Sequence, residues 1–284
     1  MHEPALRAAA FGSGSRTDPA VARGAGSPRE RLLAAVVLGA QGRYAAAAAL
    51  LDVLRRGRDP LLASLAASTL ASHRRQLGGH RRARALDGEA FAKAADLDTG
   101  PDPDGLDAAG ARADALLGLA ADNLALGRLG AARRLARRAA AEDAGWRATV
   151  RGGWVGAEIE LAAGQGAAAV PPAERALETA LARGARRHTV KSRIVLAVAL
   201  RAAGAPDHRQ ISDDLVGNAM ATAEECELLS LLWPAALVAA DLRPGHAEEY
   251  RFRVAQVLHA VLRSADPCGR RVAGESPWVP VPGG

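Results

Sequence analysis

Hydrophobic residues recur along most of this chain with the spacing of one face of an α-helix. The clearest case is residues 247–264, where five apolar side chains fall on a single face: Tyr250, Val254, Val257, Leu258 and Val261. Ser27, Pro28 and Glu30 form a helix-start signal, because Ser27 can cap, proline suits the first helical position, and Glu30 completes a capping box. The pattern therefore predicts helices from residue 28 onward.

Short turns that contain glycine separate these stretches at a regular interval. The markers Gly42, Gly78, Gly127, Gly164 and Gly204 are 36, 49, 37 and 40 residues apart. The longest interval holds an Asp-rich insertion, residues 96–107, and removing it leaves 37 residues. A sixth turn is expected at residues 243–246. This period predicts five to six antiparallel helix pairs.

The composition supports helices and argues against other classes. Hydrophobic residues make up 49% of the 284 residues, which is enough for a sizeable core and excludes full disorder. Aromatic residues make up only 3%, and β-branched residues are also few, so a mostly β fold is excluded. We expect an all-α protein in which small alanine side chains let stacked helix pairs approach closely and share one core.

The repeated pattern resembles the tetratricopeptide repeat, a helix pair with small residues at its crossings and a glycine before the turn. The matching residues are Ala35, Gly42, Tyr44 and Ala47; Ala71, Gly78, Ala83 and Ala90; Ala120, Gly127, Ala132 and Ala139; Ala157 and Gly164; and Ala197 and Gly204. The resemblance covers about residues 28–264. It implies an all-α, right-handed superhelical solenoid whose first helices line a concave surface. Another helical solenoid of similar period is the alternative.

Some features depart from that family's pattern. Only Tyr44 supplies the aromatic residue after a turn. The fourth turn is expected to extend to Pro171-Pro172, and the helix before it contains three unfavourable glycines. Pro234 is expected to bend or split the first helix of the sixth pair.

The chain divides into three segments. Residues 1–26, rich in Gly, Ser, Ala and Arg, are expected to form a flexible arm, and residues 27–265 the repeat domain. Residues 266–284 are expected to form a disordered tail rich in Pro and Gly. No stretch resembles a signal peptide or is long enough to cross a bilayer, so we expect a soluble cytoplasmic protein.

Arginine dominates the charge. The net charge is +6, and only Lys93 and Lys191 among the 37 basic residues are lysine. This bias is typical of a GC-rich genome, and we infer a bacterial source from it. The largest cluster is Arg133, Arg134, Arg137 and Arg138, and a smaller one at the expected end of another helix is Arg183, Arg186 and Arg187. We interpret these clusters as solvated outer faces, with contact to nucleic acid or an acidic partner as the alternative.

We find no pattern that indicates catalysis, a cofactor or a metal. Gly164-Gln165-Gly166 follows a helix and lacks the third glycine of a dinucleotide fingerprint. The acidic insertion has Ala111 where a calcium loop needs its bidentate Glu, so a solvated loop, able to dock on a basic surface, is the better account. Cys226 and Cys268 are expected to be ordinary reduced thiols.

The implied concave surface supplies the candidate binding residues. They are Ser72, Arg75, Asp114, Arg151, Trp154, Glu158, Lys191 and Arg201. Trp154 either anchors a bound segment or packs between helices beside the three glycines. We therefore expect a non-enzymatic scaffold or regulatory adaptor that binds a protein or peptide segment in this groove. The alternatives are a regulator that contacts nucleic acid or an acidic partner through its Arg clusters, and a protein with a small-ligand pocket inside the superhelix.

Overall fold

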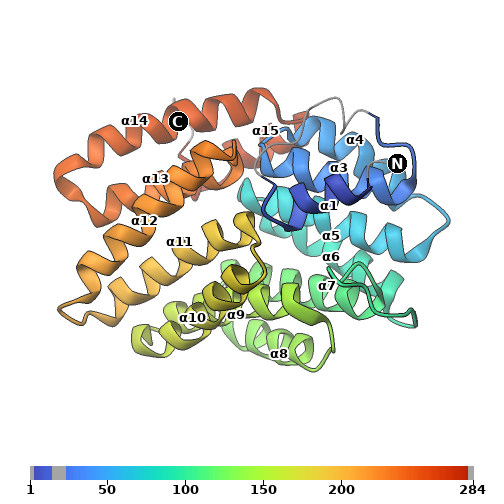
Figure 1. Ribbon diagram of the computed structural model, residues 1–284, viewed down its shortest axis with the longest axis horizontal. Helices are drawn as coiled ribbons and strands as arrows, with labels where there is room; N and C mark the ends of the chain where they lie inside the picture. The colour runs from blue at the N-terminus through green and yellow to red at the C-terminus, as the bar shows by residue number, and fades with distance from the viewer. Residues whose placement is uncertain (1–2, 15–23, 281–284) are drawn as a thin grey trace.

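The computed structural model describes residues 3–14 and 24–280. These residues contain fourteen α-helices and a 3-10 helix, and no strand. Figure 1 shows the helices arranged around a centre, with each helix lying beside the next in the chain. The all-α prediction is thus confirmed.

Twelve helices form six pairs of neighbours. The pairs are α3 (Pro28–Ala40) with α4 (Tyr44–Arg55), α5 (Pro60–Gln76) with α6 (His80–Ala94), α7 (Ala108–Ala125) with α8 (Leu129–Ala140), α9 (Gly145–Ala162) with α10 (Gly166–Ala182), α11 (Arg186–Ala203) with α12 (His208–Glu225), and α13 (Leu229–Leu242) with α14 (Ala247–Arg263). The 3-10 helix η1 (Pro244–His246) joins the sixth pair, and the five marker glycines lie between the helices of the other five. Helices α1 (Glu3–Phe11) and α15 (Pro267–Gly274) flank the pairs.

Local sequence signals set many of the boundaries. Ser27 and Glu30 form the expected capping box at the start of α3. The five marker glycines all have φ between 73° and 75°, a left-handed conformation that favours glycine. This requirement explains why glycine recurs at the turn within each of these pairs.

One proline prediction is wrong, because Pro171 and Pro172 lie inside α10 rather than in a lengthened turn. Pro234 lies inside α13, which continues past it, so the helix is not split there, and the bend stays a prediction. Gly153 of α9 lies close to the backbone of α10 at Pro172. A Cβ atom at position 153 would lie only 2.5 Å from the carbonyl oxygen of Pro172, so a larger residue would clash there. Packing between neighbouring helices thus outweighs the local preferences of both proline and glycine.

The two ends of the helix stack meet. Helix α3 contacts α13, α1 contacts α11, and the amide of Ala45 at the start of α4 donates to the carbonyl of Ser264 after α14 at 2.8 Å. A buried apolar cluster joins Tyr44 and Leu77 to Val261 and Val272. In Figure 1 the red C-terminal helices accordingly lie beside the blue N-terminal ones. The stack therefore encircles a central space.

The C-terminal segment is more ordered than its composition predicts. Residues 267–274 form α15 instead of a disordered tail, with Asp266 capping the helix and pairing with Arg74 at 2.7 Å. Val272 and Val279 are buried in the cluster that joins the chain ends. Residues 281–284 lie outside the described part of the chain. The contacts that order this segment come from α5, nearly two hundred residues away in sequence.

The N-terminal segment also differs from the flexible arm that was predicted. Residues 3–11 form α1, and Leu6 and Phe11 are buried in the core. Arg7 pairs with Asp102 and Asp104 of the acidic insertion, each at 2.8 Å. The insertion therefore docks on basic residues and helps to hold α1 in place. Residues 15–23 of the predicted arm lie outside the described part.

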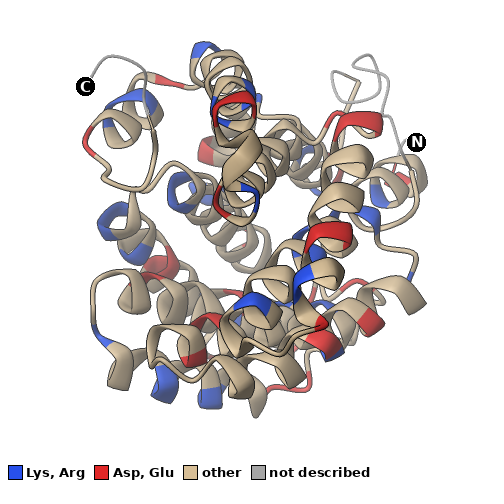
Figure 2. Ribbon diagram, turned by 90° about the vertical axis from the view of Figure 1, so that its left-hand side faces the viewer, with Lys and Arg blue, Asp and Glu red and all other residues tan. Residues whose placement is uncertain are grey.

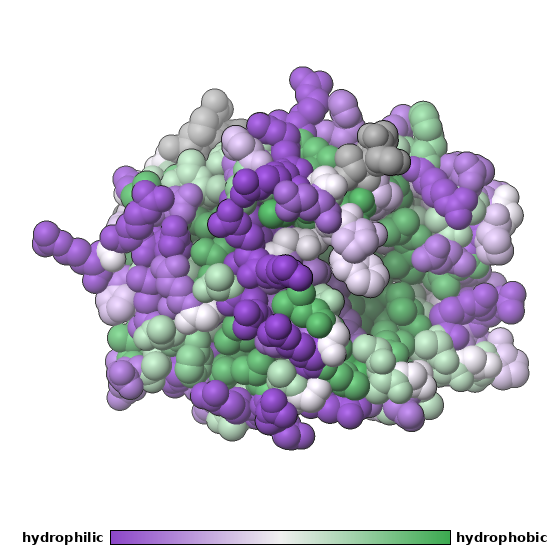
Figure 3. Space-filling model, turned by 180° about the vertical axis from the view of Figure 1, so that it is seen from behind, coloured by the Kyte–Doolittle hydropathy of each residue, from purple (hydrophilic) through white to green (hydrophobic). Residues whose placement is uncertain are grey.

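No helix within the described ranges is both long and apolar enough to cross a membrane. Seen from behind, the surface mixes hydrophilic and hydrophobic side chains and is hollowed where hydrophobic ones gather (Figure 3).

Candidate binding site in a central cavity

A cavity of about 940 Å³ lies inside the stack. All six first helices, α3, α5, α7, α9, α11 and α13, contribute side chains to its wall, whereas the second helices contribute only His80 of α6. Phe11 of α1, Gly127 of the turn between α7 and α8, and Trp278 of the C-terminal segment complete the lining. The first helices therefore face inward.

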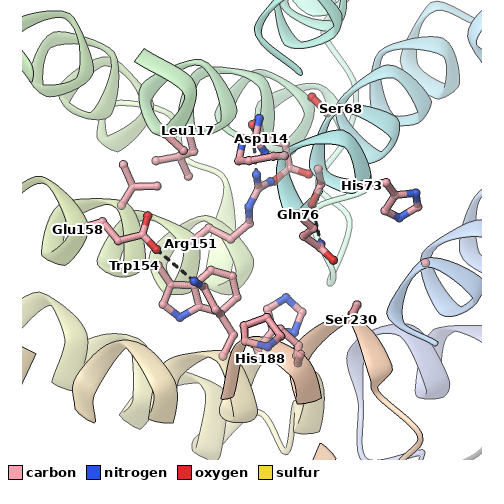
Figure 4. Close-up of a pocket in the computed structure, with 18 of the residues that line it drawn as sticks. Ser68, His73, Gln76, Asp114, Leu117, Arg151, Trp154, Glu158, His188 and Ser230 are labelled. Carbon is pink, nitrogen blue, oxygen red and sulfur yellow. Dashed lines mark hydrogen bonds and ion pairs between the residues drawn. The ribbon is translucent and has the colours of Figure 1, made fainter. Parts of the chain in front are cut away.

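Most of the predicted groove residues come together at this cavity. Seven of the eight line it: Ser72, Arg75, Asp114, Arg151, Trp154, Glu158 and Lys191. Arg201, near the end of α11, does not. Figure 4 shows Asp114 of α7 and Arg151, Trp154 and Glu158 of α9 around the same space. The structure thus brings these seven side chains together around one cavity. That they bind a ligand stays a prediction.

Arg75 is held by two buried carboxylates. It pairs with Asp122 through Nε at 2.9 Å and also with Asp87, which accepts a hydrogen bond from Ser68 at 2.8 Å. Nδ1 of His80 lies 3.1 Å from Oδ1 of Asp122, the oxygen that also accepts from Nε of Arg75. Burial raises the pKa of Asp87 to about 7, with nearby Asp122 adding to the effect and Arg75 opposing it. The charge of Arg75 is therefore already paired, and its contacts join α5 to α6 and α7.

Asp114 of α7 is a further buried carboxylate and lines the cavity. It pairs with Arg147 and Arg151 of α9, and all three side chains are at most 19% exposed. Burial opposes ionisation of Asp114, but the two guanidinium groups outweigh it and hold its pKa below the ordinary value. Arg147 also donates to the carbonyl of Asp104 at 2.8 Å, which ties the acidic insertion to α9.

Arg187 is a third cation in the same region and has no such partner. Its side chain makes no ion pair or hydrogen bond with any described residue, and its Nε is shielded from solvent. Burial and the charges of Arg147 and Arg151 lower its pKa to about 10, so it stays protonated at neutral pH. The sequence grouped Arg187 with an exposed cluster at the end of a helix, but it lies in the first turn of α11 and lines the cavity.

Unpaired polar atoms gather around this cavity. Among the described residues seven buried side-chain atoms lack a hydrogen-bond partner, and five of these belong to residues that line it. The five are Nδ1 of His73 and of His188, Nε of Arg147 and of Arg187, and Nε1 of Trp233. Buried polar groups without partners are uncommon and destabilising, so the wall of this cavity is less completely hydrogen-bonded than the rest of the described chain.

Aromatic rings form part of the wall. Trp154 stacks on His188 with ring centroids 5.7 Å apart, and its Nε1 donates to Ser192 at 2.8 Å. Trp146 meets the same imidazole edge-on at 4.9 Å. Burial lowers the pKa of His188 well below its ordinary value, as do Arg187 and the two arginines of α9. Trp154 thus packs between α9 and α11 while it also lines the cavity.

The outer Arg cluster on α8 remains largely exposed. Arg134 and Arg137 are exposed, Arg133 pairs with Glu160 at 3.3 Å, and Arg138 lies over the ring of Phe91. In the view of Figure 2, basic and acidic segments are interspersed rather than sorted into separate faces. The cluster is therefore a local patch on the outside of the stack.

The described residues include no group of three or more His, Cys, Asp or Glu side chains placed to hold a metal ion. Cys226 is buried and Cys268 is half-buried, and neither forms a disulfide.

No family model and no curated protein matches this sequence. The cavity is therefore the basis for assigning a function.

The sequence analysis did not predict several of the residues that line the cavity. Arg147 and Arg187 each precede a predicted groove residue, Arg151 and Lys191, by one helical turn, and this spacing was the available signal. Phe11, Trp233 and Trp278 gave no such signal, because their positions depend on the meeting of the two chain ends.

Proposed function

We propose that the protein is a non-enzymatic helical-repeat binding module, built as a tetratricopeptide-repeat-like superhelix, that takes a short peptide segment into its central cavity. The observation that carries the proposal is the convergence of seven of the eight concave-surface residues on one cavity lined by all six first helices. Peptide-binding helical repeats place their recognition side chains on such an inner surface.

The size of the cavity limits the ligand. Small-molecule pockets span about 300–1,000 Å³, and this cavity of about 940 Å³ lies near the upper end of that range. It suits a few residues of extended chain or a compact organic molecule, and it is too small for a folded domain. The paired charges of Lys191 and Glu158, 3.1 Å apart, offer a donor and an acceptor to a peptide backbone.

The test uses a pool of random hexapeptides, acetylated and amidated at their ends, and measures by mass spectrometry which peptides the protein retains through gel filtration. We expect retention by the wild type and a marked loss with Trp154→Leu. Arg201→Gln is the control, because Arg201 lies outside the cavity and should leave retention unchanged. Absence of retained peptides, or equal retention by Trp154→Leu, would refute the proposal.

A second candidate function is binding of nucleic acid or another acidic partner on the outside. The observation that favours it is a shallow depression of about 420 Å³ lined by Arg81, Arg84 and Arg128. None of the three forms an ion pair with a described residue. If this surface and the α8 cluster bind DNA, affinity should fall steeply with salt, and replacing Arg133, Arg134, Arg137 and Arg138 with Ala should flatten that dependence.

A further inference from the structure

The charges in the cavity do not balance at the end formed by α9 and α11. Three guanidinium groups, those of Arg147, Arg151 and Arg187, face the single carboxylate of Asp114. These charges lie close enough to affect one another. The positive charges of Arg147 and Arg151 lower the pKa of Arg187 and also that of the neighbouring His188. Among the described residues these three groups exceed Asp114 by two positive charges. Asp87, on which Arg151 also acts, is already paired with Arg75, so the excess around Asp114 is unfavourable in this half-buried region unless an anion joins it.

The free nitrogens of Arg187 point to the same kind of ligand. Its two terminal nitrogens form no hydrogen bond with a described residue and, unlike its Nε, are not shielded, so they can donate to an acceptor in the cavity. A guanidinium group has no acceptor, so the group that joins it must accept hydrogen bonds and carry negative charge.

We propose that Arg187, supported by Arg147 and Arg151, forms a subsite in the central cavity for a dianionic oxyanion of the phosphate-monoester class. The proposal rests on the cavity being the binding site and adds the chemistry of what it holds. A phosphate monoester carries about −1.5 to −2 charges at neutral pH, which matches the local excess, and its three oxygens suit the planar fork of arginine. The Trp154 ring, on the same wall, can pack against the organic part of the ligand.

Thermal unfolding and isothermal calorimetry test the subsite with three probes: inorganic phosphate, phenyl phosphate and a hexapeptide that contains phosphoserine. Phenol, the unphosphorylated hexapeptide and sodium chloride at matched ionic strength serve as controls. We expect phenyl phosphate to raise the unfolding midpoint of the wild type, because a ligand that binds only the folded state stabilises it. Binding of the phosphoserine peptide alone would assign the phosphate to a peptide, and binding of phenyl phosphate alone would assign it to a small molecule. Either result supports the subsite.

Arg187→Gln tests whether the guanidinium group itself holds the phosphate. We expect it to weaken phenyl phosphate binding roughly tenfold to a hundredfold, as the loss of charge-assisted hydrogen bonds should. The matched control is Arg134→Gln on the outer face of α8, which should leave the affinity unchanged. Without ligand, the unfolding midpoint of Arg187→Gln should stay the same or rise, because the variant removes a half-buried charge that has no partner among the described residues. A purely structural role for Arg187 would instead lower it.

The proposal is overturned if no phosphorylated probe binds, or if Arg187→Gln binds phenyl phosphate as tightly as the wild type does. It is also overturned if phenol binds as well as phenyl phosphate. These results differ from failure of the peptide-binding function. Arg187-dependent binding of phenyl phosphate with no retained hexapeptide would refute that function and leave the subsite standing. Retained neutral hexapeptides with no response to phosphate would do the reverse.

Discussion

Asp114 is the only carboxylate paired with Arg147 and Arg151 among the described residues, so replacing it with Asn should be costly. Asp114→Asn keeps the shape of the side chain but leaves these two cations, with Arg187, uncompensated inside the cavity. The Asp114 and Arg147 side chains are 8% and 10% exposed, and that of Arg151 is 19% exposed, so solvent screens the loss only weakly. Removing one partner of a buried ion pair costs about 3–5 kcal/mol, and we expect a loss of that size in the free energy of unfolding.

Urea unfolding followed by circular dichroism measures this loss. Glu158→Gln is the matched control, because its pair with Lys191 lies in the same cavity but both side chains are about one-third exposed. Partly exposed pairs contribute about 1 kcal/mol or less. Adding Arg187→Gln to Asp114→Asn should recover part of the lost stability, since it removes one of the repelling charges. A loss below about 1 kcal/mol for Asp114→Asn, or no recovery in the double variant, would refute the reasoning about the uncompensated charges.

Three other predictions concern the framework around the cavity. Between pH 5 and 7 the folded state holds a proton on Asp87 that the unfolded state has released, so wild-type stability should fall as the pH rises. In urea titrations Asp87→Asn should remove about 2–3 kcal/mol of that fall. Parallel pH profiles of the wild type and the variant would contradict this. Gly118→Ala should cost about 1–3 kcal/mol in the same assay, because its Cβ would lie 2.1 Å from Oδ2 of Asp87; an unchanged midpoint would show that the carboxylate can move. Ending the chain at Ala265 removes the buried side chains of Val272 and Val279 and should lower the calorimetric melting temperature by about 5 °C or more, whereas a disordered tail would make no difference.

The sequence alone was enough to find the helix pairs. The five marker glycines sit at the turn within each of five pairs, since each turn needs a left-handed residue and glycine adopts that conformation most readily. Hydrophobic spacing and capping residues are local properties, so the helices followed from them, whereas the inward face of the first helices was implied by the family resemblance.

The charge partners in the cavity were beyond such local reasoning. Arg75, Arg151 and Lys191 were expected to be free binding groups, but each has a carboxylate from another helix within reach. The periodicity of one helix says nothing about which side chain of the next helix it meets. The cation without a carboxylate, Arg187, was expected on the outer surface, but its helix begins two residues after the glycine at position 184 and not before it.

The sequence by itself determined the paired helices of residues 28–264 and their repeat period, because these depend on interactions between residues close along the chain. Only the tertiary structure decided that the two ends of the stack meet, that residues 3–11 and 267–274 are helical, and that the concave side becomes a cavity. Those features depend on long-range contacts, such as Arg74 with Asp266 and Arg7 with Asp102, which pair residues far apart in sequence. The uneven charge of the cavity arises in the same way, because it reflects how many acidic and basic side chains the packing of separate helices brings to one place.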